Sequence, residues 1–487
     1  MNPRASQYRK LLYAALILAI FVAMIPYSIY LDGVKAEYDL GEAQLGQVDA
    51  GDFMLNLALI GGFRGMAVNQ LWMQARDHQI AQDYDQLDAK VDLITKLQPH
   101  YLTVWTYQGW NLAYNVSVEW DDVKDKYDWI KRGIKFLQKG VSKNRTTPDL
   151  MWDTAWTYYH KIGYADEAIF LRRLFHDDID EDFRRYVDVR ADNVLSPAYD
   201  DNFRLAFGWF VRSQHLVDSG LNQKTDLKAK IDFVDPPEQH KGKPGDLAFH
   251  SMPSHSLTKY AIYLEKESKL GIRPQFGEVA RLAWQNALNE WQGPGFGRRE
   301  FDAFNDPQGN KVYLDDYTLP PEEFAKLPET RRYWTDRWAT QMNYPYWKQR
   351  AQAEMEDEGL KARELFYKGR KALKEGDFVA SIEAYAAGLA LWKELLDRFD
   401  SFREDTINQQ DTGQIVNYYI RALKQDGREI PADTPFLELG QRYANERVRD
   451  PFDALEEIPD SLYQSIQERF RRGTSANASA SAEDTLE

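Results

Sequence analysis

Two histidines of this sequence lie close enough together to suggest a metal site. His250 and His255 flank Pro253 in the segment FHSMPSH, and because the chain has no cysteine, histidines would have to supply the softer ligands. A separation of five residues does not place two rings on one face of a helix, and the zinc-binding pattern H-E-x-x-H does not occur. Ser254 is suited instead to cap a helix that starts near His255. We therefore expect this pair to bind no metal.

Three aspartates alternate along the chain in the manner of a calcium-binding loop. Asp178, Asp180 and Asp182 are separated by single residues, as the first ligands of an EF-hand are. Phe183 stands at the position where that loop needs Gly for its sharp turn, and Val189 stands where the bidentate Glu is required. We predict a solvated acidic turn here rather than a calcium site.

A glycine-rich, basic segment runs from Gly293 to Arg299 with the sequence GPGFGRR. The backbone N–H groups of such a segment can surround a phosphate when the segment follows a strand and opens a helix. No strand is predicted before this segment, and the P-loop pattern G-x-x-x-x-G-K-[ST] does not occur. The pattern favours a turn after a helix spanning Ala280 to Trp291, and no cofactor is expected.

Hydrolytic chemistry leaves no motif in the chain. The nucleophile pattern G-x-S-x-G is absent from the sequence. A Ser–His–Asp triad assembled from distant loops remains an alternative. Glycoside hydrolysis needs two facing carboxylates, and 76 acidic residues give no means of choosing a pair. Asp121 and Asp122 follow Trp120, and Asp315 and Asp316 precede a tyrosine, so either pair could lie beside an aromatic sugar platform. Surface charge is the favoured interpretation, and we assign no catalytic, cofactor-binding or metal-binding residue.

The elements that would position such side chains are predicted to be helices. Leu87, Val91, Ile94 and Leu97 recur at steps of three and four residues, which indicates a helix with one buried stripe. Alternating patterns typical of strands are scarce. Further helices are predicted at residues 102–114, 125–140, 149–162, 165–176, 255–269, 277–291, 355–375 and 378–397.

The predicted fold is all-α, an N-terminal transmembrane helix followed by a helical-hairpin solenoid with two long irregular insertions that contain Pro-Pro and Gly-Pro sequences. Residues 53–75 form a second apolar stretch that includes Arg64, and we interpret it as a buried helical hairpin rather than a membrane span. The predicted layout is a cytoplasmic N-terminus at 1–10, a transmembrane helix at 11–31, a helical domain at 32–217, an irregular loop at 218–253, a helical hairpin at 254–292, an irregular loop at 293–328, a helical region at 329–471 and a disordered tail at 472–487.

The charge and composition of the chain exclude several classes of function. With 61 Lys and Arg against 76 Asp and Glu, the formal net charge is −15, which repels phosphate backbones and makes nucleic acid an unsuitable partner. The lack of cysteine excludes disulfides, thiolate metal sites and cysteine nucleophiles. Aromatic residues reach 14%, and they serve either to fill gaps between stacked helices or to form a face that binds sugar or peptide.

A membrane anchor is predicted near the N-terminus. The segment Leu11 to Leu31 contains no charge, and a helix of that length spans a hydrocarbon core of about 30 Å. Arg4, Arg9 and Lys10 precede it, whereas the residues just after it are mainly acidic, so the N-terminus is predicted to be cytoplasmic and the bulk of the chain extracytoplasmic. A cleaved signal peptide is the alternative, but the apolar run is longer than the usual one and no A-x-A site follows.

One segment carries a repeat pattern. Residues 362–395 combine Gly369, a Gly-Asp-Phe turn at 376–378, and the small residues Ser381 and Gly388. This pattern resembles a tetratricopeptide repeat, in which small residues let two antiparallel helices approach closely; the family prefers Ala where Ser381 and Gly388 stand. Partial matches occur at residues 83–109, 152–168 and 280–288.

The resemblance implies a solenoid of stacked helical hairpins on the extracytoplasmic side. The layout is also similar to that of membrane-anchored bacterial proteins with repeat-like domains and no assigned activity. The expected function is therefore a non-enzymatic scaffold or adaptor that binds a protein or peptide partner. The alternative is a membrane-tethered envelope enzyme or glycan-binding protein that uses the two long loops, through His250 and His255, Arg298 and Arg299, and the Asp315–Asp316 pair.

The charge asymmetry around residues 11–31 predicts the topology of the chain. A reporter that is active only outside the cytoplasm, fused after Glu487, should be active in intact cells, because the positive residues hold the N-terminus inside. A cytoplasmic reporter at the same position serves as the control and should be silent. Signal from the cytoplasmic reporter alone would contradict the predicted orientation.

Overall fold

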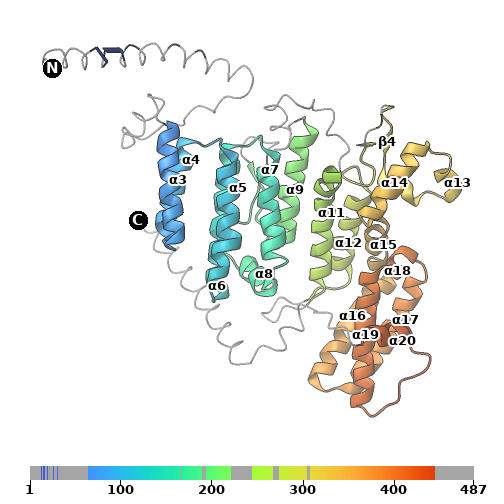
Figure 1. Ribbon diagram of the computed structural model, residues 1–487. Coiled ribbons are helices and arrows are strands. Elements are labelled where there is room, and N and C mark those ends of the chain that lie inside the picture. The colour runs from blue at the N-terminus through green and yellow to red at the C-terminus, as the bar shows by residue number, and fades with distance from the viewer. Residues whose placement is uncertain are drawn as a thin grey trace. The chain divides into compact units, whose positions relative to one another are not determined.

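The computed structural model describes most of the chain beyond the predicted anchor, and helices dominate it (Figure 1), which confirms the all-α class. By contacts the chain divides into two compact units, residues 1–111 with 136–145, and residues 112–135 with 146–487. The division falls inside the predicted domain 32–217. The described residues are 64–444 except 166, 189–193, 221–243, 267–273, 304–305 and 307, with a few positions between 12 and 30.

No helix among the described residues is both long enough and apolar enough to cross a bilayer. Most of the predicted anchor, residues 11–31, lies outside the described residues, as does the predicted disordered tail 472–487. The anchor and the tail therefore stay predictions.

The first unit is built from helices that bury one apolar stripe each. Its described elements are α3 (Arg64–Ile80), α4 (Tyr84–Leu97), α5 (Leu102–Trp110) and the C-terminal end of α6 (Val123–Lys143). The predicted stripe on α4, which begins at Leu87, is buried and packs with Val68 and Ala75 of α3. The residues from Arg64 to Ala75 belong to α3, and the first part of the predicted hairpin 53–75 lies outside the described residues.

The second unit begins with a row of helices, each packed against the next. In Figure 1 α7, α9, α11 and α12 lie side by side, and the contacts between them agree. A short hairpin of strands β1 (Val187–Asp188) and β2 (Val194–Leu195) precedes α9. The bounds are η2 (Asn111–Asn115) at the junction of the two units, η3 (Val116–Glu119), α7 (Pro148–Trp156), the π-helical turn η4 (Thr157–Ile162), α8 (Ala168–His176), α9 (Asn202–Asp218), α11 (Pro244–Leu264) and α12 (Glu278–Gln292).

The C-terminal part of the second unit is also helical, and the sequence pattern did not single out all of its helices. The helical segments that the sequence analysis predicts by residue range do not include α9, α14, α15 or α19. The bounds are α14 (Glu329–Gln341), α15 (Tyr344–Glu354), α16 (Asp357–Glu375), α17 (Phe378–Leu396), α18 (Asp400–Glu404), α19 (Thr406–Gln425) and α20 (Leu437–Arg442).

Helices α16 and α17 form the hairpin predicted at 362–395. Gly376 ends α16 with a φ of +80°, a left-handed conformation that glycine adopts without strain, and the Asp377 side chain caps α17. A Cβ on Gly369 would lie 2.9 Å from the Tyr385 ring, so this glycine is a packing residue, as predicted. Ser381, where the repeat family prefers Ala, is buried and donates a hydrogen bond to the Gly369 carbonyl at 2.8 Å.

The second long insertion, residues 293–328, is largely irregular but is fastened to the core. It contains an antiparallel pair of short strands, β3 (Phe301–Asp302) and β4 (Lys311–Val312), the turn η6 (Leu314–Thr318) and the short helix α13 (Pro321–Phe324). Several of its apolar side chains are buried in one cluster with Trp291 and Trp338, namely Phe296, Phe301, Ala303, Val312 and Leu314. Replacing this segment with a flexible linker would therefore expose the core, so it is not a dispensable connection.

The first long insertion is shorter than predicted. The irregular stretch was expected to extend to residue 253, with Ser254 as an N-cap, but α11 begins at Pro244 and runs through Pro253. Proline lacks the N–H that would bond to the carbonyl four residues earlier, which is that of Phe249. The buried side chain of Gln214 on α9 supplies the missing donor, because its Nε2 lies 3.4 Å from the Phe249 oxygen and 2.9 Å from the His250 oxygen.

The helical conformation around Pro253 should therefore depend on Gln214. Gln214→Met should lower the free energy of unfolding by about 1–3 kcal/mol, because it leaves the buried Phe249 carbonyl without a donor and removes a second bond to the His250 carbonyl. In a Pro253→Ala background the same substitution should cost less, since the restored N–H satisfies Phe249. Thermal and urea unfolding of the four proteins of this cycle measure the coupling. Equal costs in both backgrounds would show that Gln214 does not compensate for Pro253.

Candidate ligand-binding pocket

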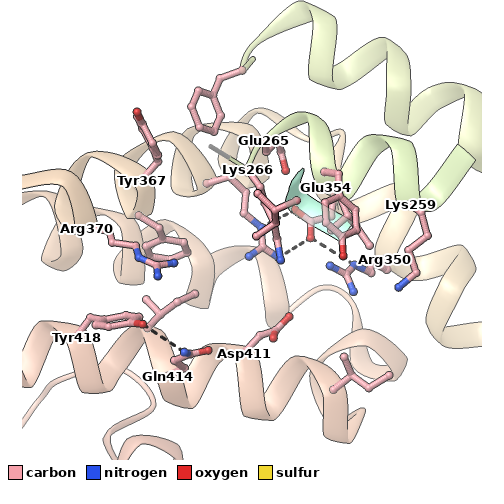
Figure 2. Close-up of a pocket in the computed structure, with 18 of the residues that line it drawn as sticks. Lys259, Glu265, Lys266, Arg350, Glu354, Tyr367, Arg370, Asp411, Gln414 and Tyr418 are labelled. Carbon is pink, nitrogen blue, oxygen red and sulfur yellow. Dashed lines mark hydrogen bonds and ion pairs between the residues drawn. The ribbon is translucent and has the colours of Figure 1, made fainter. Parts of the chain in front are cut away.

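The second unit contains a cavity of about 460 Å³ among seven of its helices. Its walls come from the start of α8, the end of α11, the middle of α12 and α15, and the facing sides of α16, α17 and α19 (Figure 2). A volume of this size falls within the range of roughly 300–1,000 Å³ that is usual for ligand pockets. The cavity lies beside the α16–α17 hairpin, but most of its walls come from other helices.

The lining of this pocket differs in charge from the rest of the chain. It carries seven basic residues and three acidic ones, although the whole chain has a formal charge of −15. Eight of its residues are aromatic, and the remainder are mainly Ala and Ile. The basic residues are Lys259, Lys266, Arg350, Arg363, Arg370, Lys371 and Lys374, and the acidic ones are Glu265, Glu354 and Asp411.

A buried carboxylate organises one end of the pocket. Glu354, the last residue of α15, has no exposed surface and accepts two hydrogen bonds from Arg363 of α16, at 2.9 Å to Nε and 2.5 Å to NH2. Arg350, one turn earlier on α15, places its Nε 3.6 Å from the same carboxylate and donates through NH1 to the hydroxyl of Tyr346 at 2.7 Å. Two guanidinium groups therefore share one carboxylate, which leaves positive charge at this end.

Glu265 lies next to this cluster, just after the end of α11. Burial, and then the negative charge of Glu354, raises the pKa of the Glu265 carboxyl group to about 8, although Arg363 and Arg350 act in the opposite direction. One of its oxygens, Oε1, is buried without a hydrogen-bond partner. At neutral pH this side chain is therefore a neutral carboxylic acid, which can donate a hydrogen bond.

Lys259 of α11 contacts Tyr164, which also lines the pocket. Its Nζ donates to the Tyr164 hydroxyl at 2.7 Å and lies 4.5 Å from the centre of that ring. Burial, and then the charge of Arg350, lowers the pKa of Lys259 to about 8, while Asp411 opposes the shift. Lys259 therefore carries a positive charge at neutral pH but loses it under mildly alkaline conditions.

The opposite wall is an aromatic and basic surface on α16 and α19 (Figure 2). The Arg370 guanidinium carbon lies 5.3 Å from the centre of the Tyr418 ring, and Gln414 donates to the Tyr418 hydroxyl at 3.3 Å. Tyr367 contacts Phe276 with ring centres 5.5 Å apart. These side chains are half-buried, so part of each can contact a ligand, and Tyr418 packs against the core as well.

A column of rings runs along α7 and η4 to the pocket. Trp152, Trp156, His160 and Tyr164 follow one another at four-residue spacing, and neighbouring rings are nearly parallel with centres 5.3, 5.0 and 6.5 Å apart. Because each ring covers the face of the next, these rings do not offer the free faces that a sugar platform requires. The column is a packed feature that ends at the pocket through Tyr164.

The two candidate histidines are core residues. Burial, and then the nearby positive charges of Arg299 and Lys259 respectively, lowers the pKa of His250 to about 3 and that of His255 to about 4. The His255 ring packs edge-on against Trp291 at 4.9 Å, which holds it in the core. Within the described part of the chain no three His, Asp or Glu side chains are grouped in a way that could hold a metal.

The charged residues of the second insertion form structural ion pairs. Asp315 accepts hydrogen bonds from Lys348 and from the Tyr344 hydroxyl, and Arg298 lies 3.4 Å from it. Asp316 pairs with Arg331 at 2.6 Å, and Arg299 pairs with Asp218 at 2.5 Å. These contacts fasten the insertion to the neighbouring helices, and none of these four insertion residues lines the pocket.

The other acidic groups also have structural partners. Asp178 accepts from the Tyr127 hydroxyl at 2.7 Å and from Lys131 at 2.8 Å, and Asp180 pairs with Lys135 at 2.9 Å. The acidic turn is therefore ion-paired to α6. Near the start of α6, Asp122 accepts a hydrogen bond from a backbone N–H at 2.8 Å.

Comparisons with known proteins add no relative. No protein-family model, no curated protein and no solved structure matches the chain significantly. The pocket was not found from the sequence because Glu265 lies 85 residues before Arg350 and because Glu265, Arg350 and Arg363 form no motif. The repeat segment 362–395 was the available signal, since it supplies part of one wall.

The raised pKa of Glu265 predicts a pH dependence of stability. A carboxyl group protonated in the folded state but ionised when unfolded contributes stability that is present below about pH 4.3 and is lost as pH rises through about 8. Glu265→Gln should therefore raise the melting temperature relative to the original chain at pH 8.5, and less so at pH 5. Thermal unfolding followed by circular dichroism measures this, with the exposed Glu329→Gln as a control that should show no such trend. A difference that does not grow with pH would contradict the assignment.

Proposed function

We propose that the chain is a membrane-anchored, tetratricopeptide-like adaptor that binds a segment of a partner protein on the extracytoplasmic side. The composition of the pocket is the observation that supports this most directly. Tyr, Trp and Arg are the residues that contribute most energy at protein interfaces, because they combine large contact area with hydrogen bonding. All three types line this cavity, beside the α16–α17 hairpin.

The volume of the pocket limits what it can hold of a partner. A cavity of about 460 Å³ accommodates a few side chains of an extended or helical segment rather than a folded domain. The partner is therefore bound through a short anchor segment, and the chain around the pocket acts as a rigid frame. The envelope enzyme or glycan-binding alternative loses its support, because the loop residues on which it was based pair with other side chains or lie in the core.

Site-specific photocrosslinking in the full-length, membrane-anchored chain tests this proposal. A photoreactive phenylalanine analogue at Tyr367 or at Tyr418 should capture the same discrete partner, because both rings line the pocket. The matched control is Tyr333 on α14, which is 55% exposed and lies outside the pocket, and it should not capture that partner.

The pocket must also be shown to provide affinity. Arg370→Ala, which removes a half-buried pocket cation, should reduce the capture at Tyr367 at least several-fold without loss of helical content. Capture of the partner from Tyr333 as efficiently as from both pocket positions, or no capture at either pocket position, would overturn the proposed function.

A further inference from the structure

Three polar atoms in the pocket are buried without a hydrogen-bond partner. They are Nε of Arg350, Nε1 of Trp284 and Oε1 of Glu265. Arg350 is 6% exposed and Trp284 is fully buried, so water does not satisfy these groups readily. Buried polar groups of folded proteins are bonded in the great majority of cases, because an unbonded one costs about 1–3 kcal/mol. The Trp284 indole faces the Glu265 carboxyl group and Arg350 Nε lies 3.6 Å from the Glu354 carboxylate, so these groups of one cavity are only incompletely bonded and keep donor capacity for a ligand.

The chemistry of the three atoms identifies the kind of partner. The guanidinium and the indole nitrogen can only donate hydrogen bonds, and the protonated carboxyl group of Glu265 can donate one as well. A ligand that satisfies all three must offer acceptors, and the nearby charges of Arg350 and Lys259 favour an anion. Figure 2 shows Arg350 and Lys259 on one side of the cavity, near Glu265 and Glu354.

The fixed acidic groups of the pocket limit the charge of that anion. Glu354 forms a salt bridge with Arg363, and Asp411 lines the same cavity. A phosphate monoester carries close to two negative charges at neutral pH and would meet more repulsion from these carboxylates than a group with one. A carboxylate carries a single charge and has two acceptor oxygens in a plane. Because the seven basic residues of the lining would also attract a phosphate, the planar pair of oxygens, rather than the charge, is the reason for assigning a carboxylate to this pocket.

We propose that the pocket binds a carboxylate side chain of an acidic, apolar segment of the partner, which accepts hydrogen bonds from Arg350, Trp284 and Glu265. This assignment rests on the proposed function and names the chemistry of the bound segment. The apolar neighbours of the acidic residue pack against Ile262, Ile415 and the wall around Tyr418. Lys259 adds attraction from the side of Tyr164.

The protonation of Glu265 makes this recognition dependent on pH. The groups that face the Glu265 carboxyl group are Glu354, Arg363, Arg350 and the indole of Trp284. When Glu265 ionises, it ceases to be a donor and repels the bound carboxylate, so binding weakens as pH rises through about 8. Lys259 loses its charge in the same range and weakens binding further.

Binding of small defined probes to the purified full-length chain tests the inference. The probes are acetyl-Leu-Glu-Phe-amide, its Gln analogue, its phosphoserine analogue, and octanoate as a free carboxylic acid. We expect the Glu peptide to bind at least tenfold more tightly than the Gln and phosphoserine peptides at pH 6.5, in ligand-observed NMR or calorimetry. Its affinity should fall at least tenfold between pH 6.5 and pH 9.

Variants separate the contributions of the pocket groups. Glu265→Gln keeps a donor and should bind the Glu peptide at pH 6.5, with a clearly smaller loss of affinity at pH 9 that reflects Lys259 alone. The matched control is Glu290→Gln on α12, since Glu290 also has a raised pKa through burial but lies outside the pocket; it should behave as the original chain does. Arg350→Lys keeps the charge but lacks Nε, and should weaken binding at least tenfold while circular dichroism shows an intact fold.

Several results would overturn the inference. These are equal binding of the Glu and Gln peptides, tighter binding of the phosphoserine peptide, binding of octanoate but of no peptide, and no binding of any probe. If such a result is accompanied by normal crosslinking of a partner at Tyr367 and Tyr418, the adaptor function stands and the carboxylate assignment alone fails. If the crosslinking fails as well, both proposals fail.

Discussion

The buried carboxylate of Glu354 is the interaction on which the second unit depends most. It ends α15 and receives two hydrogen bonds from Arg363 of the following helix, with Arg350 close by. Removing one partner of such a buried pair costs roughly 3–5 kcal/mol, because the remaining charge stays in a poorly solvated place. The same contact joins α15 to α16, and thereby connects the C-terminal hairpin to the row of helices before it. It also leaves an excess of positive charge at the inner end of the pocket.

Large aromatic side chains fill the space between the helices around this cluster. The Arg363 guanidinium carbon lies 4.3 Å from the centre of the Trp392 ring, and Trp284 is completely buried beside Glu265. Small residues make room for these rings, since a Cβ on Gly388 would lie 2.7 Å from the Phe366 ring. The high aromatic content therefore serves packing for the most part, and even among the rings that line the pocket Trp284, Phe366 and Tyr385 are buried in the core.

The charge of the pocket opposes the charge of the chain. A chain with a net charge of −15 repels acidic segments in general, whereas the seven basic residues of the pocket, against three acidic ones, would attract the acidic segment that we propose to bind there. Such an arrangement selects for a partner whose acidic residue is positioned by its apolar neighbours, because bulk charge does not favour the encounter. Specificity in this scheme comes from the geometry of a few buried donors.

The sequence by itself determined the helical class and the position of many helices. The stripe on α4 and the hairpin 362–395 follow from local periodicity and from Gly376, which must adopt a positive φ, and such signals are contained within short segments. The tertiary structure decided where a local rule fails: α11 continues through Pro253, and Gln214 from another helix donates to the freed carbonyl of Phe249. The tertiary structure likewise decided which residues form the pocket. Burial and pairing of Glu265 and Glu354 depend on helices distant in the chain, and no local pattern of residues records such contacts.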